Sequence, residues 1–185
     1  MIIPAGANEK GNTMKSKKIK AVYIEPADYF PKEIRKKYKL GEFAEPKNNI
    51  WIISSNKNIY DYVGSFAANG FIDWRHRVKF NEGDTVYVYC SKGVHKIKYK
   101  CVVLKHSMPF SERVDDEIFW KNRKEYEKSK SMRFARLKLE GEVDTDRLSL
   151  EALISNGLNK APQGPKKISP ELQAYIESCF NECKQ

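Results

Sequence analysis

The sequence predicts an α+β domain built on a small, strongly curved mixed β-sheet or barrel that is flanked by helices. Apolar runs of strand length recur along the chain, and segments with helical apolar spacing lie between them. Turns that contain glycine, asparagine or proline separate these segments. The length of 185 residues suits one domain with a hydrophobic core of its own.

The N-terminal quarter follows a different pattern from the rest of the chain. Residues 1–20 begin with glycine and asparagine, continue with lysines and show no apolar periodicity, which predicts a flexible basic tail. Residues 21–49 hold a short apolar segment, a helix opened by Pro31 and a loop around Pro46, and we interpret them as an N-terminal extension or linker. We expect the main domain at residues 50–185.

The main domain is predicted to open with a strand, a helix and two paired strands. Residues 50–53 are apolar at every position, which is typical of a strand covered on both faces. A helical pattern follows and ends at Asn69-Gly70, where glycine can take the left-handed conformation that closes a helix. Residues 85–90 and 95–104 are predicted as antiparallel strands joined by a turn at residues 91–93.

Two of these elements also predict side-chain directions. The helix is expected to bury one stripe of apolar residues, namely Ile59, Val63 and Phe66. In the strand at residues 95–104, apolar residues alternate with lysines, so one face points inward and the other displays a solvated lysine row. That row consists of Lys96, Lys98 and Lys100.

The second half of the domain continues the alternation of helices and strands. Residues 115–128 are predicted as a helix and residues 134–139 as a strand. Ser149 can cap a short helix that Asn156-Gly157 ends, and Ser169-Pro170 opens the last helix.

The composition favours a polyanionic partner and disfavours a membrane protein. Lysine and arginine number 34 against 24 acidic residues, which gives a formal net charge of +10, so nucleic acid is the leading partner class. No apolar stretch approaches the roughly 20 residues that span a bilayer. The 4 cysteines form no disulfide framework, which fits a reducing cytoplasm.

The sequence lacks the usual signatures of catalysis and of metal or cofactor binding. No histidine stands in a recognisable pattern with a serine or cysteine, and no phosphate-binding glycine loop is present. Cys179 and Cys183 have no matching ligand pair, and Asp144 and Asp146 are typical of a solvated loop. We therefore expect no enzyme, no cofactor and no metal site, while an enzyme that uses His76 or the two aspartates remains the weakest alternative.

The aromatic residues point to a different kind of site. Trp74 lies in the polar, basic segment Asp73-Trp74-Arg75-His76-Arg77, where a fully buried indole would be unusual. A slot for an unpaired base needs aromatic walls and a few small polar groups, which the strand end Ser54-Ser55-Asn56 could supply. Trp51 and Tyr89 fit a core as well as a pocket.

The chain resembles the EVE domain family of the PUA-like superfamily, whose relatives include the YTH domains. The resemblance runs from about residue 50 to the end and rests on the order and spacing of five short segments. These are residues 51–56, 72–74, 83–89, 97–103 and the loop Ala161-Pro162-Gln163-Gly164-Pro165. It implies a small PUA-like barrel flanked by helices, a pocket for a modified nucleobase and no catalytic activity.

The resemblance and the residue patterns together give a candidate site. By position, Ser54 to Asn56 match the polar strand end and Trp74 matches a cage aromatic, with Trp120, or else Phe119, as a second one. Asn56 is followed by Lys57, where the family often has proline. The predicted pocket residues are Trp51, Ser54, Ser55, Asn56, Trp74, Tyr89 and Trp120. The predicted phosphate contacts are Lys57, Arg75, Arg77, Lys166 and Lys167.

Two functional hypotheses follow. The first is a non-catalytic module that flips a modified base, with 5-substituted cytosine in DNA preferred, into an aromatic-walled pocket. Because bacterial members of the family often accompany modification-dependent defence modules, it would serve as a sensor, with a separate effector protein as partner. The alternative is an RNA-binding PUA-like protein in RNA modification or processing, which recognises modified adenine or the backbone and its shape.

Overall fold

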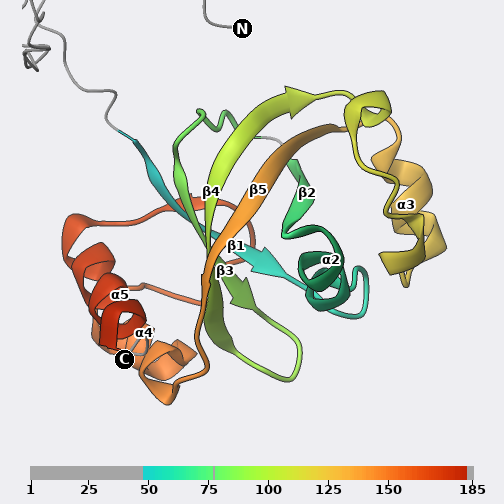
Figure 1. Ribbon diagram of the computed structural model, residues 1–185. Coiled ribbons are helices and arrows are strands. Elements are labelled where there is room, and N and C mark those ends of the chain that lie inside the picture. Colours follow the sequence, from blue (N-terminus) through green and yellow to red (C-terminus); the bar gives the residue numbers. More distant parts are fainter. Residues whose placement is uncertain (1–47, 77, 183–185) are drawn as a thin grey trace, which may run out of the picture. The chain divides into compact units, whose positions relative to one another are not determined.

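The computed structural model describes residues 48–76 and 78–182 (Figure 1). The predicted tail at residues 1–20 and nearly all of the predicted extension at 21–49 lie outside the described residues, as does Arg77.

The domain is built on one mixed sheet of six strands (Figure 1). In space the strands follow the order β2-β5-β4-β3-β1-β6, and only β1 and β3 run parallel among the paired strands. Bulges interrupt the pairing of β4 with β5 at three places, and bulges of this kind bend and twist a strand. The predicted α+β class with a curved mixed sheet is confirmed. The strands are β1 (Ile50–Ser55), β2 (Phe71–His76), β3 (Thr85–Cys90), β4 (Lys96–Met108), β5 (Arg133–Glu142) and β6 (Lys166–Lys167).

The first strand is buried on both faces, as its unbroken apolar run predicts. Ile53 belongs to one hydrophobic cluster together with the helix α2 (Tyr62–Asn69). Ile52 belongs to a second cluster beneath the helices α4 (Leu150–Ser155) and α5 (Pro170–Glu182). Both side chains are fully buried. The parallel partner β3 alternates in the same way, so the β1–β3 pair forms the centre of the packed domain.

Helices cover the two faces of the sheet, with α4 and α5 on one side and α2 on the other (Figure 1). The helix caps match the sequence signals. The Asp61 side chain accepts from the Gly64 amide at the start of α2, and Gly70 ends that helix with a φ of 71°. Ser149 caps α4 as predicted. The helices are α2 (Tyr62–Asn69), α3 (Arg123–Ser129), α4 (Leu150–Ser155) and α5 (Pro170–Glu182), with 3-10 turns η2 (Phe110–Glu112), η3 (Glu117–Phe119) and η4 (Asp146–Leu148).

Two helix predictions need correction. The predicted helix at residues 115–128 is broken into η3 and α3, because Trp120 forms an isolated bridge with Tyr60 and the Asn122 side chain starts a new helix by accepting from the Glu125 amide. In α2 the buried residues are Tyr62, Ser65 and Phe66, while Val63 is 53% exposed. Phe66 therefore faces the core as predicted, but the helix starts after Ile59, and Tyr62 takes the buried position that was predicted for Val63.

The lysine row of β4 is paired with carboxylates instead of being freely solvated. Lys96 lies 2.7 Å from Asp146, Lys98 lies 3.1 Å from Asp144, and Lys100 lies 2.8 Å from Glu177 on α5. None of the three lysine side chains is more than 24% exposed to solvent. These contacts also give Asp144 and Asp146 a structural role. The sequence predicts them as solvated loop residues, and in the structure they are counter-ions to the lysine row.

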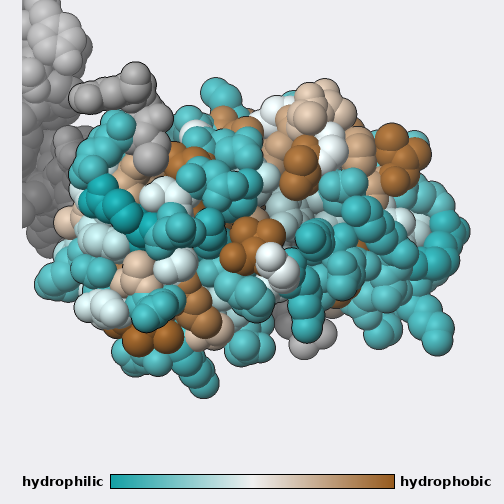
Figure 2. All heavy atoms as spheres, turned by 90° about the horizontal axis from the view of Figure 1, so that it is seen from below, coloured by the Kyte–Doolittle hydropathy of each residue, from teal (hydrophilic) through white to brown (hydrophobic). Residues whose placement is uncertain are grey.

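The outer surface shows no single large apolar face in the view of Figure 2, where hydrophilic residues dominate and apolar residues form separate patches. Within the described residues, no helix is long and apolar enough to cross a bilayer.

Buried tyrosines make the stability of the fold sensitive to alkaline pH. The Tyr87 hydroxyl is buried and donates to Glu177, and burial together with that carboxylate raises the pKa of Tyr87. A raised folded-state pKa stabilises the protein fully below the unfolded pKa near 10 and loses that stabilisation as the pH rises further. The fold should therefore weaken above about pH 10.

We expect Tyr87→Phe to reduce this alkaline loss. Between pH 9 and pH 11 the free energy of unfolding of the variant should fall by about 1.4 kcal/mol less than that of the wild type, because one tyrosine no longer titrates. Denaturant unfolding at both pH values measures the difference. An equal fall in the two proteins would show that Tyr87 does not contribute.

Candidate functional site

A cavity of about 500 Å³ lies at the carboxyl end of β1. Residues from β1, β2, the segment before α3, α3 itself and the loop before β6 surround it. The lining residues are Ser54, Asn56, Ile59, Tyr60, Tyr62, Asp73, Trp74, Arg75, His76, Val78, Trp120, Glu125, Lys128, Met132, Gln163, Gly164 and Pro165. The volume lies in the range of small-molecule sites, about 300–1,000 Å³.

Aromatic side chains form much of the wall. Trp74 comes from β2 and Trp120 from the residue after η3, and both are half-buried. Tyr60 and Tyr62 add two buried rings. The ring centroids of Tyr60 and Trp120 lie 5.2 Å apart at an interplanar angle of 67°, which is a favourable edge-to-face contact. The structure thus brings Trp74 and Trp120 to one cavity from sequence positions far apart.

Small polar groups lie at the end of β1. The Asn56 carboxamide oxygen accepts from the Asn58 amide at 3.0 Å, and its carbonyl accepts from the amides of Ile59 and Tyr60. These bonds fold the loop after β1. Among the described residues, neither the Asn56 side-chain nitrogen nor the Ser54 hydroxyl has a hydrogen-bond partner, so both remain available to a molecule in the cavity.

Three charged side chains, those of Arg75, Glu125 and Lys128, form another part of the cavity wall. Arg75 lies 2.7 Å from Glu125, and Lys128 lies 2.9 Å from the same carboxylate. Hydrogen bonds from Lys128 and Arg75 lower the pKa of Glu125, which keeps this carboxylate ionised and able to accept hydrogen bonds. The Arg75 guanidinium also lies 5.8 Å from the centre of a Trp120 ring. The structure therefore places Arg75 in the cavity wall, paired with Glu125, while its predicted phosphate contact stays a prediction.

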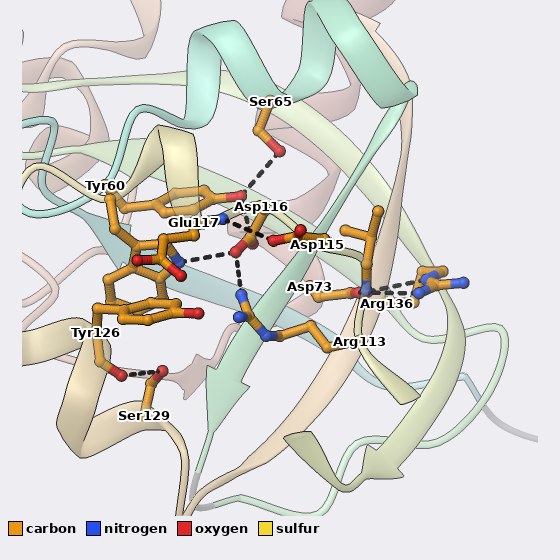
Figure 3. Close-up of polar contacts among 12 residues, drawn as sticks. Tyr60, Ser65, Asp73, Arg113, Asp115, Asp116, Glu117, Tyr126, Ser129 and Arg136 are labelled. Atoms are coloured by element: carbon orange, nitrogen blue, oxygen red, sulfur yellow. Dashed lines mark hydrogen bonds and ion pairs between the residues drawn. The ribbon is translucent and has the colours of Figure 1, made fainter. Parts of the chain in front are cut away.

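A buried ion pair fixes the strand that carries Trp74. The Asp73 carboxylate accepts from Arg136 at 2.8 Å through both oxygens and from the Val114 amide at 2.8 Å (Figure 3). These bonds tie β2 to β5 and to the segment that leads toward Trp120. Paired and hydrogen-bonded in this way, a buried carboxylate can be accommodated.

Three residues predicted for the pocket do not line this cavity. Trp51 is 7% exposed, and its indole nitrogen donates to Asp84 at 2.9 Å within the core. Ser55 is 1% exposed and donates to the Tyr89 carbonyl, and Tyr89 itself is buried in the cluster beneath α5. Each of these side chains is used by packing or by an internal hydrogen bond, which corrects the prediction.

Two of the lysines predicted to contact phosphates, Lys57 and Lys166, are exposed and adjoin cavity-lining residues in the sequence. Lys57 follows Asn56, and Lys166 follows Pro165. Neither forms an ion pair with another described residue. Lys167 differs, because its ammonium lies 2.5 Å from the Asn49 side-chain oxygen and 5.1 Å from the Trp51 ring centre.

Several lining residues were missed by sequence reasoning. Tyr60 and Tyr62 follow the predicted polar strand end within six positions, which is a usable local signal. The loop at residues 161–165 was used only as one of the segments that support the family resemblance, and no site residue was predicted in it. In the structure it supplies Gln163, Gly164 and Pro165 to the cavity. A side-chain carbon added at Gly164 would meet no atom within 4 Å, so this part of the wall has open space. Glu125 had no signal before the fold was known.

The part of the chain that the structure describes holds no group of three or more histidine, cysteine, aspartate or glutamate side chains that could bind a metal ion.

Comparison with known proteins gives structural matches only. No family model matches the sequence, and no curated protein does. A mutant form of the ASCH protein from Zymomonas mobilis aligns with a TM-score of 0.54 at 11% identity, over 72% of this chain and 98% of that chain. The ASCH structure from the same organism aligns with a TM-score of 0.51 at 13% identity, over 70% and 94% of the two chains.

A hypothetical protein from Leishmania major aligns with a TM-score of 0.54 at 16% identity, over 75% of this chain and 98% of that chain. At these identities the likeness is one of fold. The protein has a PUA-like fold. Each of these neighbours is aligned over almost its whole length, and the shared fold agrees with the fold class that the sequence predicted.

We expect the three tryptophans to differ in their access to solvent. With Trp74→Phe and Trp120→Phe combined, the remaining Trp51 should be poorly quenched by acrylamide, because it is sealed in the core. With Trp51→Phe and Trp120→Phe combined, the remaining Trp74 should be quenched several times more strongly, because it faces the cavity. Equal quenching constants would contradict the assignment of Trp51 to the core and Trp74 to the cavity.

Proposed function

We propose that this protein is a nucleic-acid-binding module of the EVE type that takes one unpaired or flipped modified base into the cavity between Trp74 and Trp120. The single observation that supports this proposal is the combination of four aromatic rings with free polar groups at one end of a cavity of about 500 Å³. Every base has an apolar π face and a polar edge, so such a cavity suits it on both counts.

The polar groups suit a base that carries both acceptors and an amino group. The Asn56 amide nitrogen and the Ser54 hydroxyl can donate to ring nitrogen or carbonyl acceptors, and the ionised Glu125 can accept from an exocyclic amino group. Cytosine presents acceptors and an amino donor on one edge. A substituent at its carbon 5 would then occupy apolar space, where each buried methyl group contributes about 0.8 kcal/mol.

We therefore propose 5-substituted cytosine in DNA as the preferred target, read without chemistry on the base. On this proposal the protein acts in the cytoplasm as the sensor of a modification-dependent defence system and requires a separate effector protein. The cavity contacts proposed here do not depend on the sugar, so a modified adenine or another RNA base is the alternative occupant. Parallel DNA and RNA probes decide between the two.

The first test measures affinity for a set of single strands that differ at one base. Strands with cytosine, 5-methylcytosine, 5-hydroxymethylcytosine and N6-methyladenine are compared, each as DNA and as RNA. We expect the 5-methylcytosine strand to bind about fourfold more tightly than the plain cytosine strand, because one additional methyl group is buried. Equal affinity for all modified and plain strands would contradict base reading.

Trp74→Ala should remove the preference and weaken binding by about 1–3 kcal/mol, the contribution of one stacked base. The matched control is Tyr89→Phe, because Tyr89 lies in the other hydrophobic cluster and should leave affinity unchanged. Circular dichroism and thermal unfolding check that both variants fold. A folded Trp74→Ala protein with wild-type preference would refute the assignment of Trp74.

A second test addresses the flanking lysines. Lys57→Gln and Lys166→Gln should each reduce the slope of log affinity against log salt by about 0.7 on single strands, because each would lose one phosphate contact. Lys96→Gln serves as the control, since its ammonium is already paired with Asp146 at 2.7 Å. Titration at several salt concentrations measures the slopes, and unchanged slopes for both lysines would assign the backbone contacts to other residues.

A further inference from the structure

We propose that Asp116 is a positioning residue of the cavity, a buried carboxylate that holds Trp120 and Tyr60 in place before any base arrives. This inference rests on the proposed function for its ligand, but its structural part stands on the contacts of Asp116 alone. Asp116 does not line the cavity, and nothing in its local sequence marks it as part of a site.

Both oxygens of Asp116 are occupied by cavity-wall residues. The Trp120 indole nitrogen donates to Oδ1 at 2.9 Å, and the Tyr60 hydroxyl donates to Oδ2 at 2.9 Å. Tyr60 has one proton, which goes to the carboxylate, so Ser65 donates to the Tyr60 oxygen at 2.8 Å (Figure 3). The directions of the three hydrogen bonds are thus determined, and neither aromatic side chain can turn without breaking one.

Arg113 makes the buried charge tolerable. Its side chain is 2% exposed and pairs with Oδ1 of Asp116, whose own side chain is fully buried (Figure 3). The guanidinium lies 4.4 Å from the Phe110 ring centre and 5.2 Å from that of Phe134. A buried carboxylate is costly unless it is both paired and hydrogen-bonded, and Asp116 meets both conditions.

The arrangement links two walls that the chain does not link locally. Tyr60 and Asp116 are 56 positions apart, and the backbone of Tyr60 pairs with that of Trp120 through an isolated bridge. Burial and the neighbouring Asp116 raise the pKa of Tyr60, so its hydroxyl stays protonated and continues to donate. Both rings are therefore held by the protein's own contacts, which lowers the ordering cost of binding.

The chain contains a matched control for this geometry. Asp84 is also fully buried and accepts from a tryptophan indole, that of Trp51, at 2.9 Å. It further accepts from the amides of Asn49 at 2.8 Å and Asn81 at 3.0 Å. Trp51 lies outside the cavity lining, so Asp84→Asn perturbs the same chemistry without touching the site.

The experiment compares Asp116→Asn, Tyr60→Phe and Asp84→Asn in the full-length protein. Affinity is measured with single-stranded DNA that carries one 5-methylcytosine, or with the tightest strand of the set described above. Indole N–H signals in ¹⁵N NMR, assigned with Trp120→Phe, report on Trp120 directly. Thermal unfolding reports on stability.

We expect Asp116→Asn to bind about tenfold more weakly and to show faster solvent exchange of the Trp120 indole proton. Tyr60→Phe removes only one hydrogen-bond donor, so it should bind about threefold more weakly than the wild type and also show faster exchange of the Trp120 indole proton. Asp84→Asn should lose stability while its affinity and the Trp120 signal stay at wild-type values. If Asp116→Asn fails to fold, Tyr60→Phe carries the same comparison.

Wild-type affinity and an unchanged Trp120 signal in folded Asp116→Asn, or in Tyr60→Phe, would overturn the inference, as would an equal loss of affinity in Asp84→Asn. If the wild-type protein binds none of the strands, the proposed function fails. The Trp120 exchange rate still decides whether Asp116 positions the indole in that case, because it needs no ligand.

Discussion

The described fold depends on one repeated interaction, a buried aspartate that accepts hydrogen bonds from segments far apart in the sequence. Asp73, Asp84 and Asp116 are each no more than 4% exposed. Asp84 and Asp116 bind the indole nitrogens of Trp51 and Trp120, and Asp73 anchors the strand that carries Trp74. All three tryptophans are thereby placed by carboxylates, and an unpaired carboxylate in the interior would cost several kcal/mol.

Local pattern was enough to predict much of the sheet and one side of the cavity. The unbroken apolar run of β1 predicted burial on both faces, and the polar context of Trp74 indicated a half-buried indole. Trp51 was wrongly predicted to line the pocket, because its indole partner Asp84 lies 33 positions away and no local pattern reveals the pairing. Neither the role of Asp116 nor the break between η3 and α3 could be predicted from the sequence. Both depend on the bridge between Tyr60 and Trp120, which only the folded chain creates.

The formal net charge of +10 does not say which basic groups of the described surface are open to a polyanion. The β4 lysines face Asp144, Asp146 and Glu177, and Arg113 and Arg136 are paired with buried aspartates. Charge counted from a sequence takes no account of such pairing. On the proposed function, the exposed lysines at positions 57 and 166 are better placed to contact phosphates than the paired row on β4.

The open space at Gly164 gives the cavity an adjustable rim. The loop that carries it leads into β6, which pairs with β1 over only two residues, and it belongs to neither hydrophobic cluster. A side-chain carbon added there would meet no atom within 4 Å. On the proposed function, a side chain at this loop position would narrow the cavity and so change which bases fit, while the aspartate-anchored walls stay as they are.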